Sequence, residues 1–267
     1  MKTAIIIPCY NEAKRLDKQA FSAFILEDNN YHLCFVNDGS KDNTLEVLHE
    51  LQKVDENKVS VIDMKRNSGK ATAVRAGARY LYSRSDVKQM GFIDADLSTD
   101  FKDFDELVKK LEDNTQLKMV FGSRNSGDND DIKRDGSRKL LSNIVKLFIY
   151  MILGLPIKDT QCGAKVFTRD VIPMLYGRSF KSKWLFDVEI FLRLKRSYGN
   201  SKMVMNHILE VPLKRWVHMD DSKLGMVDSL KIPLALMEIW LSYNTPSFEM
   251  KMERTFEPEV IPSFSIA

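Results

Sequence analysis

Two aspartates in the stretch GFIDADLSTD, residues 91–100, have a spacing that could support chemistry. Asp94 and Asp96 flank the small residue Ala95 and follow an apolar run that begins at Met90. Carboxylate oxygens suit Mg²⁺ and Mn²⁺, which keep several waters and often bridge a protein to substrate phosphates. The pair could therefore bind a divalent cation, or it could only cap the helix that follows. The spacing alone leaves both interpretations open.

Polar groups also follow the other apolar runs of the first half. Asp38, in VNDGSKDNT, could accept hydrogen bonds from a base or a ribose, or lie in a turn whose helix is capped by Ser40 or Asp42. Gly69 and Lys70, in NSGK, precede a predicted helix, where backbone N–H groups favour phosphate. Walker A spacing and G-x-G-x-x-G after the first strand are both missing, so neither an ATPase nor a dinucleotide site is indicated.

These groups need a scaffold that brings strand ends to one edge. Short apolar runs at 3–8, 32–38, 58–64, 90–96 and 117–124 alternate with amphipathic segments at 13–28, 43–54, 70–84 and 101–113. The alternation predicts an α/β fold with a mostly parallel central sheet flanked by helices. In such sheets, ligands bind beyond the carboxyl ends of the strands.

The pattern changes after residue 125. We predict helices at 140–155, 181–199 and 223–243, the last interrupted at Pro233. Residues 202–216 are predicted to form a strand, and the proline-containing segment 244–267 an irregular tail.

Composition limits the class of protein. The 267 residues are 44% hydrophobic, enough for a sizeable core, and a net charge of +3 does not indicate nucleic-acid binding. The three cysteines, Cys9, Cys34 and Cys162, form neither a zinc pattern nor a disulfide framework, which favours a reducing compartment. No apolar run reaches the length of a membrane span and no signal peptide is evident, so we expect a cytoplasmic protein that is not integral to a membrane.

Several motifs together resemble a known family. AIIIPCYNEAKRL, VNDGSKDNT, RNSGKATAVRAG, DADLST and GSR occur in the order found in family 2 glycosyltransferases, which have the GT-A nucleotide-sugar-binding fold. Within that family, DTQCGAKVF, WLFDVEI and DDSKL look most like dolichyl-phosphate β-glucosyltransferases, with polyprenyl-phosphate mannose synthases as close relatives. Two features depart from the resemblance: Asp221 stands where those enzymes usually have glycine, and we expect no N-terminal membrane anchor.

The resemblance implies roles in donor binding. Asp38 would hold the uracil or ribose, Asp94 and Asp96 would bind Mg²⁺ or Mn²⁺ on the donor diphosphate, and Asp96 would be catalytic. The residues implied to line the nucleotide pocket are Pro8, Tyr10, Asn11 and Glu12. Those implied to lie beside the nucleotide or diphosphate are Gly69, Lys70 and Lys223. The domain would span residues 1–243, with a nucleotide-sugar half at 1–124 and an acceptor half at 125–243.

The resemblance also implies an acceptor phosphate site. Arg124, Arg138 and Ser142 would bind the phosphate of a polyprenyl acceptor, and the planar fork of arginine suits paired phosphate oxygens. Lys133 and Lys139 fit a solvated loop better. Asp187 is the tempting catalytic base, but we expect it to bind sugar hydroxyls or to orient a basic neighbour.

The apolar helix at 140–155 has two interpretations. It could be a core helix, or it could lie in a membrane interface together with the stretch around Trp240 and Tyr243. We predict a peripheral enzyme on the cytoplasmic membrane face. It would move a hexose from a nucleotide sugar such as UDP-glucose to a polyprenyl or dolichyl phosphate, with inversion of configuration at the anomeric carbon. The alternatives are GDP-mannose as donor, a glycan or protein hydroxyl as acceptor, and a non-catalytic nucleotide-sugar-binding scaffold.

Overall fold

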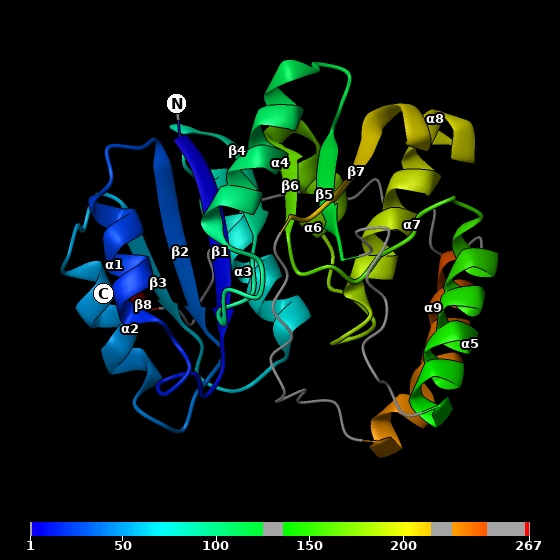
Figure 1. The fold of residues 1–267 in the computed structure, drawn as a ribbon, viewed down its shortest axis with the longest axis horizontal. Coiled ribbons are helices and arrows are strands. Elements are labelled where there is room, and N and C mark those ends of the chain that lie inside the picture. The colour runs from blue at the N-terminus through cyan, green and yellow to red at the C-terminus, as the bar shows by residue number, and fades with distance from the viewer. Residues whose placement is uncertain (1, 125–135, 215–225, 245–264, 267) are drawn as a thin grey trace.

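The computed structural model describes residues 2–124, 136–214, 226–244 and 265–266 (Figure 1). Within these ranges one sheet has eight strands in the order β7-β5-β6-β4-β1-β2-β3-β8. The strands are β1 (Lys2–Cys9), β2 (Tyr31–Asn37), β3 (Val59–Asp63), β4 (Val87–Phe92), β5 (Met119–Ser123), β6 (Lys165–Thr168), β7 (Ile208–Pro212) and β8 (Ser265–Ile266).

Most neighbouring strands are parallel, as the sequence predicts. β1 pairs in parallel with β2 and β4, β2 with β3, and β5 with β7. β6 runs antiparallel between β4 and β5, so Lys165 at its start pairs with Phe92 at the end of β4. The start of β6 therefore lies at the same sheet edge as the carboxyl end of β4. The short strand β8, within the segment expected to be irregular, pairs antiparallel with β3.

Helices cover both faces of the sheet (Figure 1). They are α1 (Lys18–Leu26), α2 (Thr44–Gln52), α3 (Lys70–Ser83), α4 (Phe101–Asp113), α5 (Gly136–Leu153), α6 (Ile172–Tyr176), α7 (Phe186–Tyr198), α8 (Ser201–His207) and α9 (Met226–Asn244), with a 3-10 turn at Arg169–Val171. One core packs α1, α2 and α4 on the sheet, and the other packs α3, α6 and α7 with the inner sides of α5 and α9.

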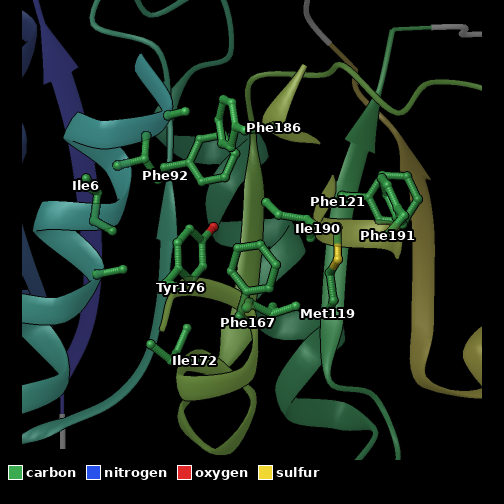
Figure 2. Close-up of a cluster of buried hydrophobic side chains, with 14 of the residues drawn as sticks. Ile6, Phe92, Met119, Phe121, Phe167, Ile172, Tyr176, Phe186, Ile190 and Phe191 are labelled. Atoms are coloured by element: carbon green, nitrogen blue, oxygen red, sulfur yellow. The ribbon is translucent and has the colours of Figure 1, made fainter. Parts of the chain in front are cut away.

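Aromatic residues fill the second core where α6 and α7 cross the sheet (Figure 2). The ring of Phe92, on β4, lies 5.7 Å from that of Phe186, on α7, and 6.4 Å from that of Phe167, on β6. Tyr176, on α6, packs edge-on against Phe167 at 5.7 Å. These contacts tie α7 to the end of β4, which fixes the position of the polar residues that follow Phe92.

The strand predicted over residues 202–216 is wrong for its first part. Ser201–His207 form α8, and the strand β7 begins only at Ile208. Gly199 adopts a positive φ and ends α7, and the side chain of Asn200 accepts a hydrogen bond from the Met203 N–H to start α8. Local capping thus favours a helix in a segment predicted to be a strand.

The helices α5 and α9 lie side by side at one end of the molecule (Figure 1). Each turns one set of apolar side chains inward: Val145, Ile149 and Leu153 on α5, and Leu236, Ile239 and Tyr243 on α9. Each also leaves large apolar side chains exposed, namely Leu147, Phe148, Tyr150, Met151, Leu234, Met237, Trp240 and Leu241. We call these eight residues the apolar helix face. The inner side of the 140–155 helix is therefore part of the core, whereas its contact with a membrane stays a prediction.

Candidate active site

Asp94 and Asp96 lie in the loop that follows β4. The structure assigns helix capping to another residue, because Asp100 accepts a hydrogen bond from the Asp103 N–H at the start of α4. Lys70, at the start of α3, donates a hydrogen bond to Asp94, and Arg15 lies 3.2 Å from Asp96. The acidic pair thus faces cations of the protein, and its capping interpretation does not hold.

Lys70 is at the centre of the charge arrangement. Burial alone would lower the pKa of its ammonium group, but the carboxylates of Asp94, Asp187 and Asp96 outweigh burial and raise the pKa. The predicted residues Lys70, Asp94, Asp96 and Asp187 are therefore brought together, although they are far apart in sequence. We call these four residues, with Lys165 and Arg15, the acidic edge.

Asp187 lies in the first turn of α7 and is buried beside a lysine. The Nζ atom of Lys165 is 2.6 Å from Asp187 and 2.7 Å from the carbonyl oxygen of Cys162. The Lys165 side chain has no exposed surface, so its charge is offset by this pairing. Two roles were expected for Asp187: binding sugar hydroxyls, or orienting a basic neighbour. Its contact with Lys165 has the geometry of the second role.

Gly163 permits the close approach of the loop before β6 to Asp94. A Cβ atom at position 163 would lie 2.1 Å from Oδ2 of Asp94. Such a contact is far inside van der Waals distance, so any larger residue would displace the carboxylate. The segment DTQCGAK is therefore adapted to the loop that carries Asp94 and Asp96.

Asp38 holds the loop that precedes α3. One of its oxygens accepts a hydrogen bond from the Ser68 N–H at 2.7 Å, and the other accepts one from the Gly69 N–H at 2.8 Å. Burial raises the pKa of Asp38, and these two hydrogen bonds partly counteract the rise. Gly69 has φ +92°, a conformation that favours glycine. The expected contact of Asp38 with a base or ribose would have to share these oxygens.

The other predicted donor residues lie after β1. Asn11 has φ +53°, its side chain accepts a hydrogen bond from the Lys41 N–H, and its own N–H donates to Ser40. Glu12 is buried, with Arg15 3.6 Å away. Pro8, in β1, and Tyr10, just after it, are partly exposed at the carboxyl end of the strand. The loop after β1 is thus tied to the loop after β2.

The predicted acceptor residues are only partly described. Arg124, after β5, donates from Nε and Nη2 to the two oxygens of Asp159, at 2.7 and 2.8 Å. Burial would lower the pKa of Arg124, but Asp159 outweighs burial and raises it. A phosphate would have to approach the other edge of this guanidinium. Arg138 and Ser142 belong to α5, but their side chains lie outside the described parts of the structure, as does Lys223 altogether.

The chemistry of the acidic pair fits a divalent cation. Within the described ranges, no third histidine, cysteine, aspartate or glutamate joins Asp94 and Asp96 in a metal-binding cluster. Mg²⁺ is commonly bound through one or two carboxylates, with water and substrate phosphates as its other ligands. Asp94 and Asp96 would hold such an ion once the donor phosphates supply the remaining ligands.

Four residues of the site were missed by the sequence analysis. Lys165, Gly163 and Asp159 all lie in DTQCGAK, and Arg15 lies in AKRL. The clustering of polar residues and glycine in DTQCGAK is a signal that could have drawn attention to this segment. Its partners, however, come from β4, β5 and α7, which only the fold identifies.

Comparisons with known proteins agree with this fold. The chain aligns over 90% of its length with the glucosyl-3-phosphoglycerate synthase of Mycobacterium tuberculosis bound to Mn²⁺, UDP-glucose and phosphoglyceric acid, with a TM-score of 0.64, 18% identity and 79% of that chain covered. The fold is therefore the GT-A fold. The family model described as glycosyl transferase family 2 matches residues 4–173, so the chain belongs to this family and is a glycosyltransferase.

Similar proteins in the same family carry a common name. The chain is 33% identical to a dolichyl-phosphate beta-glucosyltransferase of Trichomonas vaginalis, covering 90% of this chain and 73% of that protein. It is 30% identical to the dolichyl-phosphate beta-glucosyltransferase of Homo sapiens, covering 94% of this chain and 78% of that protein.

Proposed function

We propose that this glycosyltransferase moves glucose from UDP-glucose to a dolichyl or other polyprenyl phosphate, with inversion at the anomeric carbon. The names of the relatives from Trichomonas vaginalis and Homo sapiens support both the sugar and the acceptor. The fold shared with a synthase that binds UDP-glucose and Mn²⁺ supports the donor and the metal. The protein would work as a peripheral enzyme on the cytoplasmic membrane face.

The main structural support for a lipid acceptor is the apolar helix face. Trp240, on α9, and Tyr150, on α5, are 43% and 57% exposed, among six further exposed apolar residues on the same two helices. Large apolar side chains exposed in this number fit a membrane or ligand surface. None of the helices in the described ranges combines the length and the apolar composition that crossing a membrane requires. A surface contact therefore fits this face.

The reaction would be a direct displacement. An oxygen of the acceptor phosphate forms a bond to the anomeric carbon, and the bond from that carbon to the UDP oxygen breaks, leaving the electron pair on UDP. A divalent cation held at Asp94 and Asp96 would offset the charge of the departing diphosphate. Lys70 would hold Asp94 in place and add a positive charge beside it.

The acceptor would need no base from the protein. A phosphomonoester has a second pKa of about 6 and is largely a dianion at pH 7, so its oxygen attacks without losing a proton. The task of the protein is then orientation and charge compensation. Asp187, paired with Lys165, would orient the sugar or its basic neighbour, and Arg124 and Arg138 would hold the acceptor phosphate.

One assay tests the proposal. The purified protein is incubated with a panel of nucleotide sugars, Mg²⁺ or Mn²⁺, and either a prenyl phosphate or the matching prenyl alcohol. We expect glucolipid from UDP-glucose and the phosphate, and none from the alcohol. Efficient glycosylation of the alcohol, or recovery of Asp187→Asn activity as the pH rises, would mean that the enzyme uses a base and that its acceptor is a hydroxyl.

A further inference from the structure

The segment between α6 and α7, residues 177–185, lies over the NSGK loop. The carbonyl oxygen of Lys183 accepts a hydrogen bond from the Ala71 N–H, at 3.3 Å. The aliphatic stem of Lys183 covers Gly69, because a Cβ atom added to Gly69 would lie 2.9–3.0 Å from its Cβ, Cγ and Cδ atoms. Lys183 thus covers the loop that the family resemblance assigns to the donor.

The charge of Lys183 also reaches this loop. Burial raises the pKa of Asp38, the hydrogen bonds from Ser68 and Gly69 counteract the rise, and the positive charge of Lys183 adds to that counteraction. The positive charge of Lys183 therefore acts on Asp38, while the side chain remains exposed to solvent. A cation in this position is accessible to an anionic ligand that enters from solvent.

A buried network fixes the path of the segment. Glu189, on α7 and fully buried, accepts hydrogen bonds from the N–H groups of Lys181 and Ser182 at 3.0 and 2.8 Å. Arg193 donates to the carbonyl oxygens of residues 175, 178 and 179, and the hydroxyl of Tyr243, on α9, donates to Glu189 at 2.8 Å. The segment is therefore held before any ligand arrives, which reduces the entropy lost on binding.

We propose that Lys183 binds the diphosphate of the nucleotide-sugar donor and that Glu189 is its positioning residue. The inference rests on the proposed function, because it takes the donor to be a nucleoside diphosphate sugar. It adds a cation over the NSGK loop to a site whose carboxylates, Asp94 and Asp96, would by themselves repel a diphosphate.

The test compares nucleotide binding by isothermal titration calorimetry, with Mn²⁺, for the wild type, Lys183→Ala, Lys183→Arg and the matched control Lys181→Ala. Lys183→Ala should weaken UDP binding about tenfold or more, because a charge-assisted hydrogen bond is lost. Uridine binding should be unchanged, Lys183→Arg should retain part of the affinity, and Lys181→Ala should match the wild type. Equal UDP affinity in the two alanine variants, or equal losses for UDP and uridine, would overturn the assignment.

Glu189 is tested in a double-mutant cycle. Glu189→Gln alone should weaken UDP binding, but in the Lys183→Ala background it should cause no further loss. A loss of equal size in both backgrounds would mean that Glu189 only supports the fold.

GDP binding is measured in parallel with UDP binding, and the variants are compared using the nucleotide that the wild type binds. A wild type that binds neither nucleotide would refute the proposed function itself, whereas binding without any effect of Lys183→Ala would refute only this inference.

Discussion

The acidic edge and the apolar helix face differ in where their partners come from. At the acidic edge, Lys70 contacts Asp94, Arg15 contacts Asp96, and Lys165 contacts Asp187, so the protein itself supplies the opposite charges. On the apolar helix face, side chains such as Leu234, 65% exposed, and Trp240 face solvent. Charges can be held ready within a protein when they are paired. Exposed apolar groups instead indicate a partner from outside.

The helix α7 connects the two regions. Asp187, in its first turn, pairs with Lys165 at the acidic edge. Further along α7, Glu189 and Arg193 both hydrogen-bond the hydroxyl of Tyr243, on the inner side of α9. A donor held at the acidic edge and a lipid held at the helix face would therefore rest on one rigid element. The predictions below ask whether the two regions can be changed separately.

The largest effect is expected from breaking the buried ion pair. Lys165→Met leaves the Asp187 carboxylate buried without its cation, which should lower the free energy of unfolding by about 3–5 kcal/mol. Urea denaturation followed by circular dichroism measures this change. The double variant Lys165→Met/Asp187→Leu should regain most of the stability, because it removes both charges. Wild-type stability in the single variant would contradict the role of the pair.

Asp96→Asn should reduce turnover about 10²- to 10³-fold, the effect of losing a key electrostatic contact in a transition state. UDP-glucose binding in the presence of Mn²⁺ should weaken, and sedimentation with liposomes should not change. Steady-state kinetics and calorimetry make these measurements. If the wild type keeps its full turnover in EDTA, the metal hypothesis for Asp94 and Asp96 is wrong.

Arg138→Ala tests the predicted acceptor site at the start of α5. Loss of a charge-assisted contact to the lipid phosphate should weaken acceptor binding by about 1.5–3 kcal/mol, seen as a higher KM for prenyl phosphate. Donor affinity should stay nearly the same, and Lys139→Ala serves as the neighbouring control. Arg138→Lys should restore little, because lysine lacks the planar fork. A collapse of donor binding would mean that Arg138 belongs to the donor site instead of the acceptor site.

The smallest effects are expected on the apolar helix face. Leu234→Ser and Trp240→Ser should each weaken binding to anionic liposomes by about 1 kcal/mol, roughly fivefold, through lost apolar burial. Leu26→Ser, on α1 at 71% exposure, is the matched control and should have no effect. High salt should release part of the bound wild-type protein. If the protein fails to sediment with liposomes of any composition, α5 and α9 have a structural role only.

The sequence by itself determined the alternation of strands and helices and the family. Short apolar runs between amphipathic segments are local signals, and they correctly predicted β1 to β5 and the helices between them. The motif order was also sufficient to recognise a glycosyltransferase, because each motif is a short run of neighbouring residues. Local patterns failed at residues 201–207, where Asn200 starts a helix in a stretch predicted to be a strand.

Only the tertiary structure decided which charges meet and which apolar residues face solvent. Arg15 and Asp96 are 81 residues apart, and Lys165 reaches Asp187 because β6 runs antiparallel to β4 and starts at the sheet edge where β4 ends. The apolar helix at 140–155 looked uniform in sequence, yet packing against α7 and α9 buries Ile149 and leaves Met151 exposed. Contacts between distant segments depend on strand order and helix packing, and no local pattern encodes either of these.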